Sequence, residues 1–256
     1  MSGSNAKISV ITVCYQAVKT IAATIQSVLE QTDADMEYVI VDGGSTDGTL
    51  DRIRAVSDSR IQLISERDQG IYDAMNKGVR LCRGEYGIFI NGVDLFADRE
   101  VLHTAAQAMG REKPDILYGD YLNMYEDHCA LVDNGKEKIG SWYFLMSKMI
   151  CHQAIFAKRE LLLRYPFDVR YRYAADRKWL ITCVKNGASL KHLPVPVSYY
   201  DRRGVSSDEG NFEAVRREID LCLQEEYPVR GRLLMLVKRN KKLREWIRGR
   251  IFKKQL

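Results

Sequence analysis

The sequence predicts an α/β fold in which a mostly parallel central sheet is flanked by helices. Short, β-branched apolar runs alternate with segments of helical periodicity over residues 7–109. The apolar runs are continuous, which is typical of strands buried on both faces of a parallel sheet. Four strand–helix units in series imply right-handed crossovers, and ligands of such sheets bind outside the carboxyl ends of the strands.

The four strands are expected at 7–14, 36–42, 60–65 and 85–91, where the sequence reads KISVITVC, MEYVIVD, RIQLIS and EYGIFIN. The helices between them are expected from apolar residues at intervals of three and four. The first of these helices carries such a face in Ile21, Ile25, Val28 and Leu29.

Beyond residue 120 the pattern is looser. Residues 149–162 are expected to form a strand and then a helix, and residues 172–187 a helix that ends at Gly187. Residues 191–207 contain two prolines, so we expect an edge strand followed by a loop. No Pro/Gly/Ser-rich linker marks a second domain.

The composition is that of an ordinary soluble globular protein, with 46% hydrophobic and 29% charged residues. No apolar run reaches the roughly 18 residues of a membrane-spanning helix. The first apolar run continues into patterned sequence, which indicates a strand and not a signal peptide. The six cysteines lack CxxC spacing, so we expect reduced, buried thiols in a cytosolic protein instead of disulfides or a zinc site.

Charge is concentrated at the C-terminus. The chain has 39 basic and 34 acidic residues, and residues 229–256 hold 11 of the basic residues and one of the acidic residues. The rest of the chain therefore has 28 basic and 33 acidic residues. Leu236, Leu243, Ile247 and Ile251 place an apolar stripe along this basic segment, so it is expected to be an amphipathic helix. Nucleic-acid binding, a solvated appendage and contact with an anionic membrane are the three interpretations. The stripe favours the membrane.

Aspartates end two of the expected strands. Asp42 precedes Gly43 and Gly44, which let a ligand approach the backbone closely, and its carboxylate can accept hydrogen bonds from a base or a ribose. Asp94 follows the fourth strand, where a carboxylate can hold a divalent cation that bridges two phosphates. For both, an ordinary turn residue is the alternative. Asp47 is expected to cap the next helix.

Two further segments carry candidate chemistry. Residues 65–78 read SERDQGIYDAMNKG and form either a wall of the same site or a solvated polar loop. Asp176 follows two alanines at an expected helix start, where a carboxylate facing a cleft can act as a general base. Helix capping or a salt bridge is the alternative for Asp176.

Seven segments in chain order carry a family resemblance: ISVITVCYQ, YVIVDGGSTDGT, SERDQGIYDAMNKG, GEYGIFINGVD, CHQAIFAKREL, YRYAADRKWLI and DRRGVSS. The series resembles the family 2 glycosyltransferases with the GT-A fold, and most closely the branch that builds bacterial O-antigen, capsule and colanic acid. The resemblance covers about residues 7–210 and rests chiefly on VDGGSTDGT together with DQGIYDAMNKG.

The resemblance implies a site for a nucleotide-diphosphate sugar, usually a UDP-sugar. Asp42 would recognise the base, and Tyr15 would help to form the base pocket. The other residues expected on the donor side are Thr12, Arg67, Asp68, Asn76, Asn91, Arg202 and Arg203.

The resemblance also implies the catalytic parts. The metal motif corresponds to residues 91–94, in which Val93 replaces one expected acid and Asp94 would bind Mn²⁺ or Mg²⁺. Asp176 occupies the position of the general base, where Ala175 replaces the usual glutamate. The residues expected to border the acceptor are His152 and Gln153.

The implied function is inverting transfer of a sugar to a lipid-linked or saccharide acceptor in surface polysaccharide biosynthesis. A non-catalytic sugar-nucleotide-binding relative and a nucleotidyltransferase are the alternatives. One domain is expected over 1–228, with a nucleotide-sugar half at about 1–120, an acceptor half at about 121–228, and a basic tail at 229–256. We expect a cytoplasmic protein on the inner face of the cytoplasmic membrane, without a nucleic-acid partner.

Overall fold

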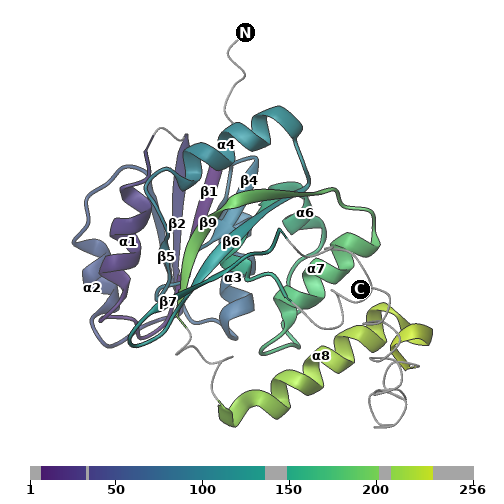
Figure 1. Cartoon of the computed structure of the whole chain (residues 1–256). Coiled ribbons are helices and arrows are strands. Elements are labelled where there is room, and N and C mark those ends of the chain that lie inside the picture. The colour runs from purple at the N-terminus through teal and green to yellow at the C-terminus, as the bar shows by residue number, and fades with distance from the viewer. Residues whose placement is uncertain (1–6, 33–34, 136–148, 202–208, 233–256) are drawn as a thin grey trace.

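The structure is a computed structural model, and it describes residues 7–32, 35–135, 149–201 and 209–232. A nine-stranded sheet forms its centre, with the strand order β3-β2-β1-β4-β8-β6-β9-β5 and with β7 paired to β6. Helices lie around this sheet, and α8 lies beside α7, away from α1 and α2 (Figure 1). The predicted α/β class is confirmed.

One half of the sheet is wholly parallel. Its ladders join β2 to β3, β1 to β2 and β1 to β4. Both β1 and β2 are buried almost throughout, which explains their continuous apolar sequences. The strands of this half are β1 (Ile8–Cys14), β2 (Met36–Asp42), β3 (Ile61–Ser65) and β4 (Tyr86–Phe89).

The other half is mixed. Strand β8 joins the two halves through antiparallel ladders with β4 and β6, and β6 then pairs in parallel with β9. The short β5 pairs with the end of β9, and β7 pairs with β6, both antiparallel. The strands of this half are β5 (Leu95–Phe96), β6 (Ile116–Met124), β7 (Cys129–Val132), β8 (Ile155–Lys158) and β9 (Leu190–Asp201).

The helices cover the sheet closely. Helix α3 packs on β1 and β2, and Gly78 makes this possible, because a Cβ there would lie 2.5 Å from Cγ2 of Ile11. Helix α1 packs on β5 and α4 on β9. The helices are α1 (Ile21–Leu29), α2 (Thr49–Arg54), α3 (Ile71–Leu81), α4 (Val101–Glu112), α6 (Arg159–Arg164), α7 (Ala175–Lys185) and α8 (Phe212–Glu226), with 3-10 turns η1 (His152–Ala154) and η3 (Glu209–Asn211).

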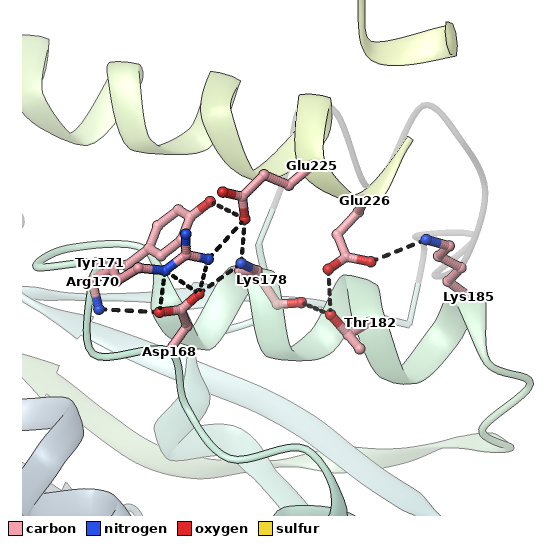
Figure 2. A network of polar contacts seen from close by, with 8 residues as sticks. All are labelled: Asp168, Arg170, Tyr171, Lys178, Thr182, Lys185, Glu225 and Glu226. Atoms are coloured by element: carbon pink, nitrogen blue, oxygen red, sulfur yellow. Dashed lines mark hydrogen bonds and ion pairs between the residues drawn. The ribbon is translucent and has the colours of Figure 1, made fainter. Parts of the chain in front are cut away.

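A polar network fastens α8 to α7 (Figure 2). Lys178 of α7 contacts Asp168 at 2.7 Å and also pairs with Glu225 of α8. One turn further along, Thr182 donates a hydrogen bond to Glu226 at 3.0 Å, and Lys185 pairs with Glu226 at 3.3 Å. Lys178 is largely buried, so this joint is less screened by solvent than an ordinary surface ion pair.

Several sequence expectations need adjustment. The expected helix at 172–187 is shorter, Ala175–Lys185. Strand β9 is not the last strand of the sheet, but β5 pairs only with Ser198 and Tyr199 near its end. Cys129 is exposed and Cys151 is half-buried, so the expectation of buried thiols holds for four of the six cysteines. The tail from residue 233 and the predicted amphipathic helix in it lie outside the described residues.

Candidate active site

Tyr15, Gly43 and Asp68 meet where β1, β2 and β3 end. A Cβ on Gly43 would lie 2.5 Å from Oδ2 of Asp68 and 3.4 Å from Cδ2 of Tyr15. A larger residue at position 43 would therefore require the Asp68 side chain to move. Tyr15 is 65% exposed, which leaves its ring open to a ligand.

Asp42 lies beneath this group and is fully buried. Its Oδ2 accepts a hydrogen bond from Oγ of Ser65 at 2.7 Å and from the backbone N–H of Ser45 at 3.1 Å. These contacts hold the loop that follows β2 against the end of β3. A ligand reaches the Asp42 carboxylate only by displacing a neighbouring group.

The loop between β3 and α3 forms the next wall. Arg67 lies against Gly44, and a Cβ on Gly44 would be 3.4 Å from Cγ of Arg67. Asp68 accepts a hydrogen bond from the N–H of Gly70 at 2.9 Å, and Gly70 has a φ of +118° that favours glycine. Lys77 donates to the carbonyl of Arg67 at 2.8 Å. The loop is thus an ordered part of the site.

Asp94 lies after β4 and is 1% exposed. Gln153 donates a hydrogen bond to its Oδ2 at 2.7 Å, and the N–H of Asp201 donates to its Oδ1 at 3.3 Å. Burial raises the pKa of Asp94 to about 6, although the hydrogen bond from Gln153 acts in the opposite direction. Val93 is 38% exposed and supplies no ligand atom.

Asp176 lies in the first turn of α7 and receives three hydrogen bonds. Its donors are Nδ1 of His152 at 3.0 Å, the hydroxyl of Tyr72 at 3.1 Å and the N–H of Arg177 at 2.7 Å. Burial acts to raise the pKa of Asp176, but the hydrogen bonds from His152, the N–H of Arg177 and Tyr72 together outweigh it and hold that pKa below its usual value. Asp176 is therefore a half-buried carboxylate that is ionised at neutral pH, with 16% of its side chain exposed.

The turn η1 connects these two carboxylates. Its adjacent residues His152 and Gln153 contact Asp176 and Asp94 respectively. Nε2 of His152 also lies 3.0 Å from Nδ2 of Asn91, at the end of β4. A cavity of about 10 Å³ beside His152 and Asp176 is lined mainly by apolar residues and has room for at most about one water.

Helix α8 holds the backbone that leads into α7. The Glu218 carboxylate accepts hydrogen bonds from the N–H groups of Arg172 at 2.8 Å, Tyr173 at 2.8 Å and Ala174 at 3.0 Å. The sequence reasoning missed Glu218 and Tyr72, because their contacts join segments far apart in the chain. In the sequence, neither Glu218 nor Tyr72 belongs to a pattern that would distinguish it from other polar residues of a helix.

Two predicted donor residues have structural contacts. Thr12 is fully buried, and its hydroxyl donates to the carbonyl of Ile90 at 2.6 Å. The side chain of Asn76 bonds the backbone N–H and carbonyl of Phe167 at 2.9 and 2.8 Å. A nucleotide role for either residue stays a prediction, and Arg202 and Arg203 lie outside the described residues.

A second group of possible metal ligands is remote from this site. Ligand atoms of Asp120, Asp133 and His192 lie within 4.8 Å of one another. His192 stands nine residues before Asp201 on β9, or roughly 30 Å at the rise of a strand.

Among the described residues, no helix is long and apolar enough to cross a membrane.

The model of the family described as "Glycosyl transferase family 2" matches residues 9–137. A "PGL/p-HBAD biosynthesis glycosyltransferase" from Mycobacterium bovis (strain BCG / Pasteur 1173P2) is 32% identical over 206 residues, which are 77% of each chain. "Glycosyltransferase GlyG" from Streptococcus pneumoniae is 25% identical over 185 residues, 65% of this chain and 61% of that protein. The chain belongs to glycosyltransferase family 2.

Solved structures agree on the fold. Staphylococcus aureus TarS 1-349 in complex with UDP-GlcNAc aligns with a TM-score of 0.70 and 19% identity, over 85% of this chain and 66% of that chain. The mannosyltransferase PcManGT from Pyrobaculum calidifontis, in complex with GDP-Man and Mn²⁺, aligns with a TM-score of 0.63 and 20% identity, over 88% and 64%. This chain thus spans less than two thirds of either one. The GT-A-like fold that the sequence predicted is confirmed.

Proposed function

We propose that this protein is an inverting glycosyltransferase that uses a nucleotide-diphosphate sugar, with a UDP-sugar as the expected donor. The observation that carries the proposal is the presence of two features: a cluster of side chains at the strand ends and a half-buried, ionised carboxylate. Tyr15, Gly43 and Asp68 form the first part, and Asp176 is the second. Family membership and solved relatives bound to UDP-GlcNAc and GDP-Man support it.

The donor half recognises the nucleotide in this proposal. The exposed ring of Tyr15 stacks on the base, and Asp42 accepts a hydrogen bond from it once Ser65 or the loop gives way. Arg67 and Asp68 lie beside the nucleotide. Arg202 and Arg203 follow β9 and are proposed to offset negative charge on the diphosphate.

A divalent cation fits the chemistry of Asp94. Mg²⁺ is commonly held by one or two carboxylates together with substrate phosphates. A single carboxylate after β4 is therefore enough protein ligand for a site of this type. Its two engaged oxygens still have free lone pairs. Asp94 would hold Mn²⁺ or Mg²⁺, which would supply positive charge to the leaving diphosphate.

Transfer then needs one displacement. Asp176 takes the proton of an acceptor hydroxyl, the hydroxyl oxygen attacks the anomeric carbon, and the bond from that carbon to the diphosphate breaks. Attack from the face opposite the diphosphate inverts the anomeric configuration. His152 and Gln153 lie between the carboxylates, on the side where we place the acceptor.

The acceptor is proposed to be lipid-linked or a saccharide, in bacterial surface polysaccharide biosynthesis. The M. bovis relative is named for PGL/p-HBAD biosynthesis. The 229–256 tail has 11 basic residues and is proposed to rest on an anionic membrane surface, which would keep the protein at the inner face of the cytoplasmic membrane.

Calorimetric titration with UDP, GDP, CDP and dTDP, with and without Mn²⁺, tests the donor assignment. Metal-dependent binding of UDP is expected, followed by release of UDP from a UDP-sugar when an acceptor is present. Binding without transfer to any acceptor would indicate a non-catalytic relative. Release of pyrophosphate from a nucleoside triphosphate would indicate a nucleotidyltransferase.

A further inference from the structure

We propose that His152 is a positioning residue for proton transfer, which fixes the Asp176 carboxylate through Nδ1 while Asn91 fixes the imidazole through Nε2. The proposal rests on the proposed function, because it takes Asp176 as the base. It changes the predicted place of His152 from the border of the acceptor to support of the base.

The geometry determines the tautomer of His152. An ionised carboxylate has no proton to donate, so the 3.0 Å contact with Asp176 requires a proton on Nδ1. A neutral ring then has its lone pair on Nε2, and the Nδ2 group of Asn91 lies 3.0 Å away to donate to it. Both ring nitrogens are used, and the ring plane is fixed from two sides.

The surroundings make this support necessary. Asp176 is half-buried and borders an apolar cavity that Phe167 and Trp179 also line, so water stabilises its charge less than it would at an exposed position. Burial alone would therefore favour the neutral acid, which cannot accept a proton. His152 offsets that preference with a hydrogen bond, and it does so without carrying the transferred proton itself.

Other ionisable groups near Asp176 do not replace His152. Burial raises the pKa of Tyr72 on α3 and of Cys151 beside η1 well above their usual values, so both stay neutral. Tyr72 still donates one hydrogen bond to Asp176. Arg177 contributes its backbone N–H and a favourable charge, and Glu218 of α8 acts on Tyr72.

His152 also lies near the second carboxylate of the site. Its neighbour Gln153 donates a hydrogen bond to Asp94, and its partner Asn91 lies two residues after β4, between that strand and Asp94. Two adjacent residues of one short turn therefore hold Asp176 and Asp94.

Two substitutions separate the functions of the ring nitrogens. In His152→Asn the amide nitrogen can occupy the place of Nδ1 and keep the bond to Asp176, whereas in His152→Gln it can occupy the place of Nε2 and lose that bond. We would measure the Asp176 carboxyl titration by ¹³C NMR in the full-length protein, assigned with Asp176→Asn. His152→Gln should raise the midpoint by about one pH unit or more over His152→Asn.

Sugar transfer should follow the same order. The kcat of His152→Gln should be about tenfold to a hundredfold below that of His152→Asn, with the same donor Kd in both variants. Equal midpoints and equal kcat values in the two variants would overturn the proposal. If the wild type transfers no sugar while the midpoints still differ, the proposed function fails and the contact between His152 and Asp176 stands.

A measurement on the wild type covers the case in which a variant does not fold. The ¹⁵N shifts of the His152 ring at neutral pH should report a proton on Nδ1 and an unprotonated Nε2. A ring protonated on Nε2 alone would overturn the assignment, since it could not donate to Asp176.

Discussion

The proposed donor side and the proposed acceptor side of the site are built in different ways. On the proposed donor side, Tyr15 follows β1 directly, Asp42 is the last residue of β2 and Asp68 lies three residues after β3, so the end of the sheet places them. On the acceptor side, Asp176 depends on partners that are 24 and 104 residues away in sequence, His152 and Tyr72. Asp94 stands between the two, with contacts to residues 59 and 107 positions later.

This difference predicts how each side responds to change. A donor-side substitution should alter nucleotide affinity and leave the rest of the protein intact. An acceptor-side substitution should alter the rate of transfer even when it lies on α8, because that helix holds the backbone before α7. The two kinds of effect are separable as Kd and kcat.

Removal of the base should have the largest effect. Asp176→Asn keeps the shape of the side chain but cannot take a proton, so kcat should fall about 10²–10⁴-fold while the donor Kd stays the same. Single-turnover assays with a UDP-sugar, together with calorimetry, measure both quantities. Transfer near the wild-type rate would remove Asp176 from the base role.

Removal of the metal ligand should have the next largest effect. Asp94→Ala should abolish the dependence of UDP binding on Mn²⁺ and leave the weaker metal-free binding. Unchanged metal dependence would exclude Asp94 as the ligand. Asp98→Ala is the matched control, because Asp98 lies nearby in the chain and bonds the N–H of Glu100 at 2.8 Å.

The raised pKa of Asp94 predicts that metal binding depends on pH. Burial raises the pKa of Asp94 to about 6, so protons compete with the cation below that pH. The apparent affinity for Mn²⁺ should therefore fall about tenfold for each pH unit below 6 and level off above it. Titration of the protein with Mn²⁺ and UDP between pH 5 and pH 8 measures this dependence. A flat profile would contradict the assignment of Asp94.

The sequence predicts the strands that frame the proposed donor side because their signals are local. Apolar runs identify β1 to β4, and the glycines after Asp42 mark the turn where we propose that the nucleotide binds. Gly43 lies close to Asp68 in that turn, since a Cβ on it would be 2.5 Å from Oδ2 of Asp68.

The acceptor side was predicted less completely for the opposite reason. The sequence singled out Asp176 and His152, but their contact depends on how η1 and α7 pack together. The hydrogen bond of Tyr72 and the cap that Glu218 provides join three helices, and no periodicity encodes either contact. Such partners become visible only when the chain is folded.

A substitution on α8 tests whether the acceptor side is as distributed as its contacts imply. Glu218→Gln replaces one of two accepting oxygens with a donor, so the backbone before α7 should shift and kcat should fall about tenfold. UDP affinity should not change. Glu213→Gln is the matched control, because Glu213 lies on the same helix and pairs with Arg217 at the surface. Equal kcat values in the two variants would show that α8 does not support the base.

The smallest expected effect is on the proposed donor side, where the affinity for UDP should change instead of kcat. Tyr15→Ala removes an exposed ring, so the free energy of unfolding should stay within about 0.5 kcal/mol of wild type. UDP affinity should fall about tenfold, since stacking of a base on an aromatic ring is worth about 1–3 kcal/mol. Calorimetry and thermal melts measure the two quantities, and Tyr15→Phe should bind UDP as the wild type does. A loss of kcat with unchanged UDP affinity would instead show that Tyr15 acts on transfer, and the division into a local donor side and a distributed acceptor side would not hold.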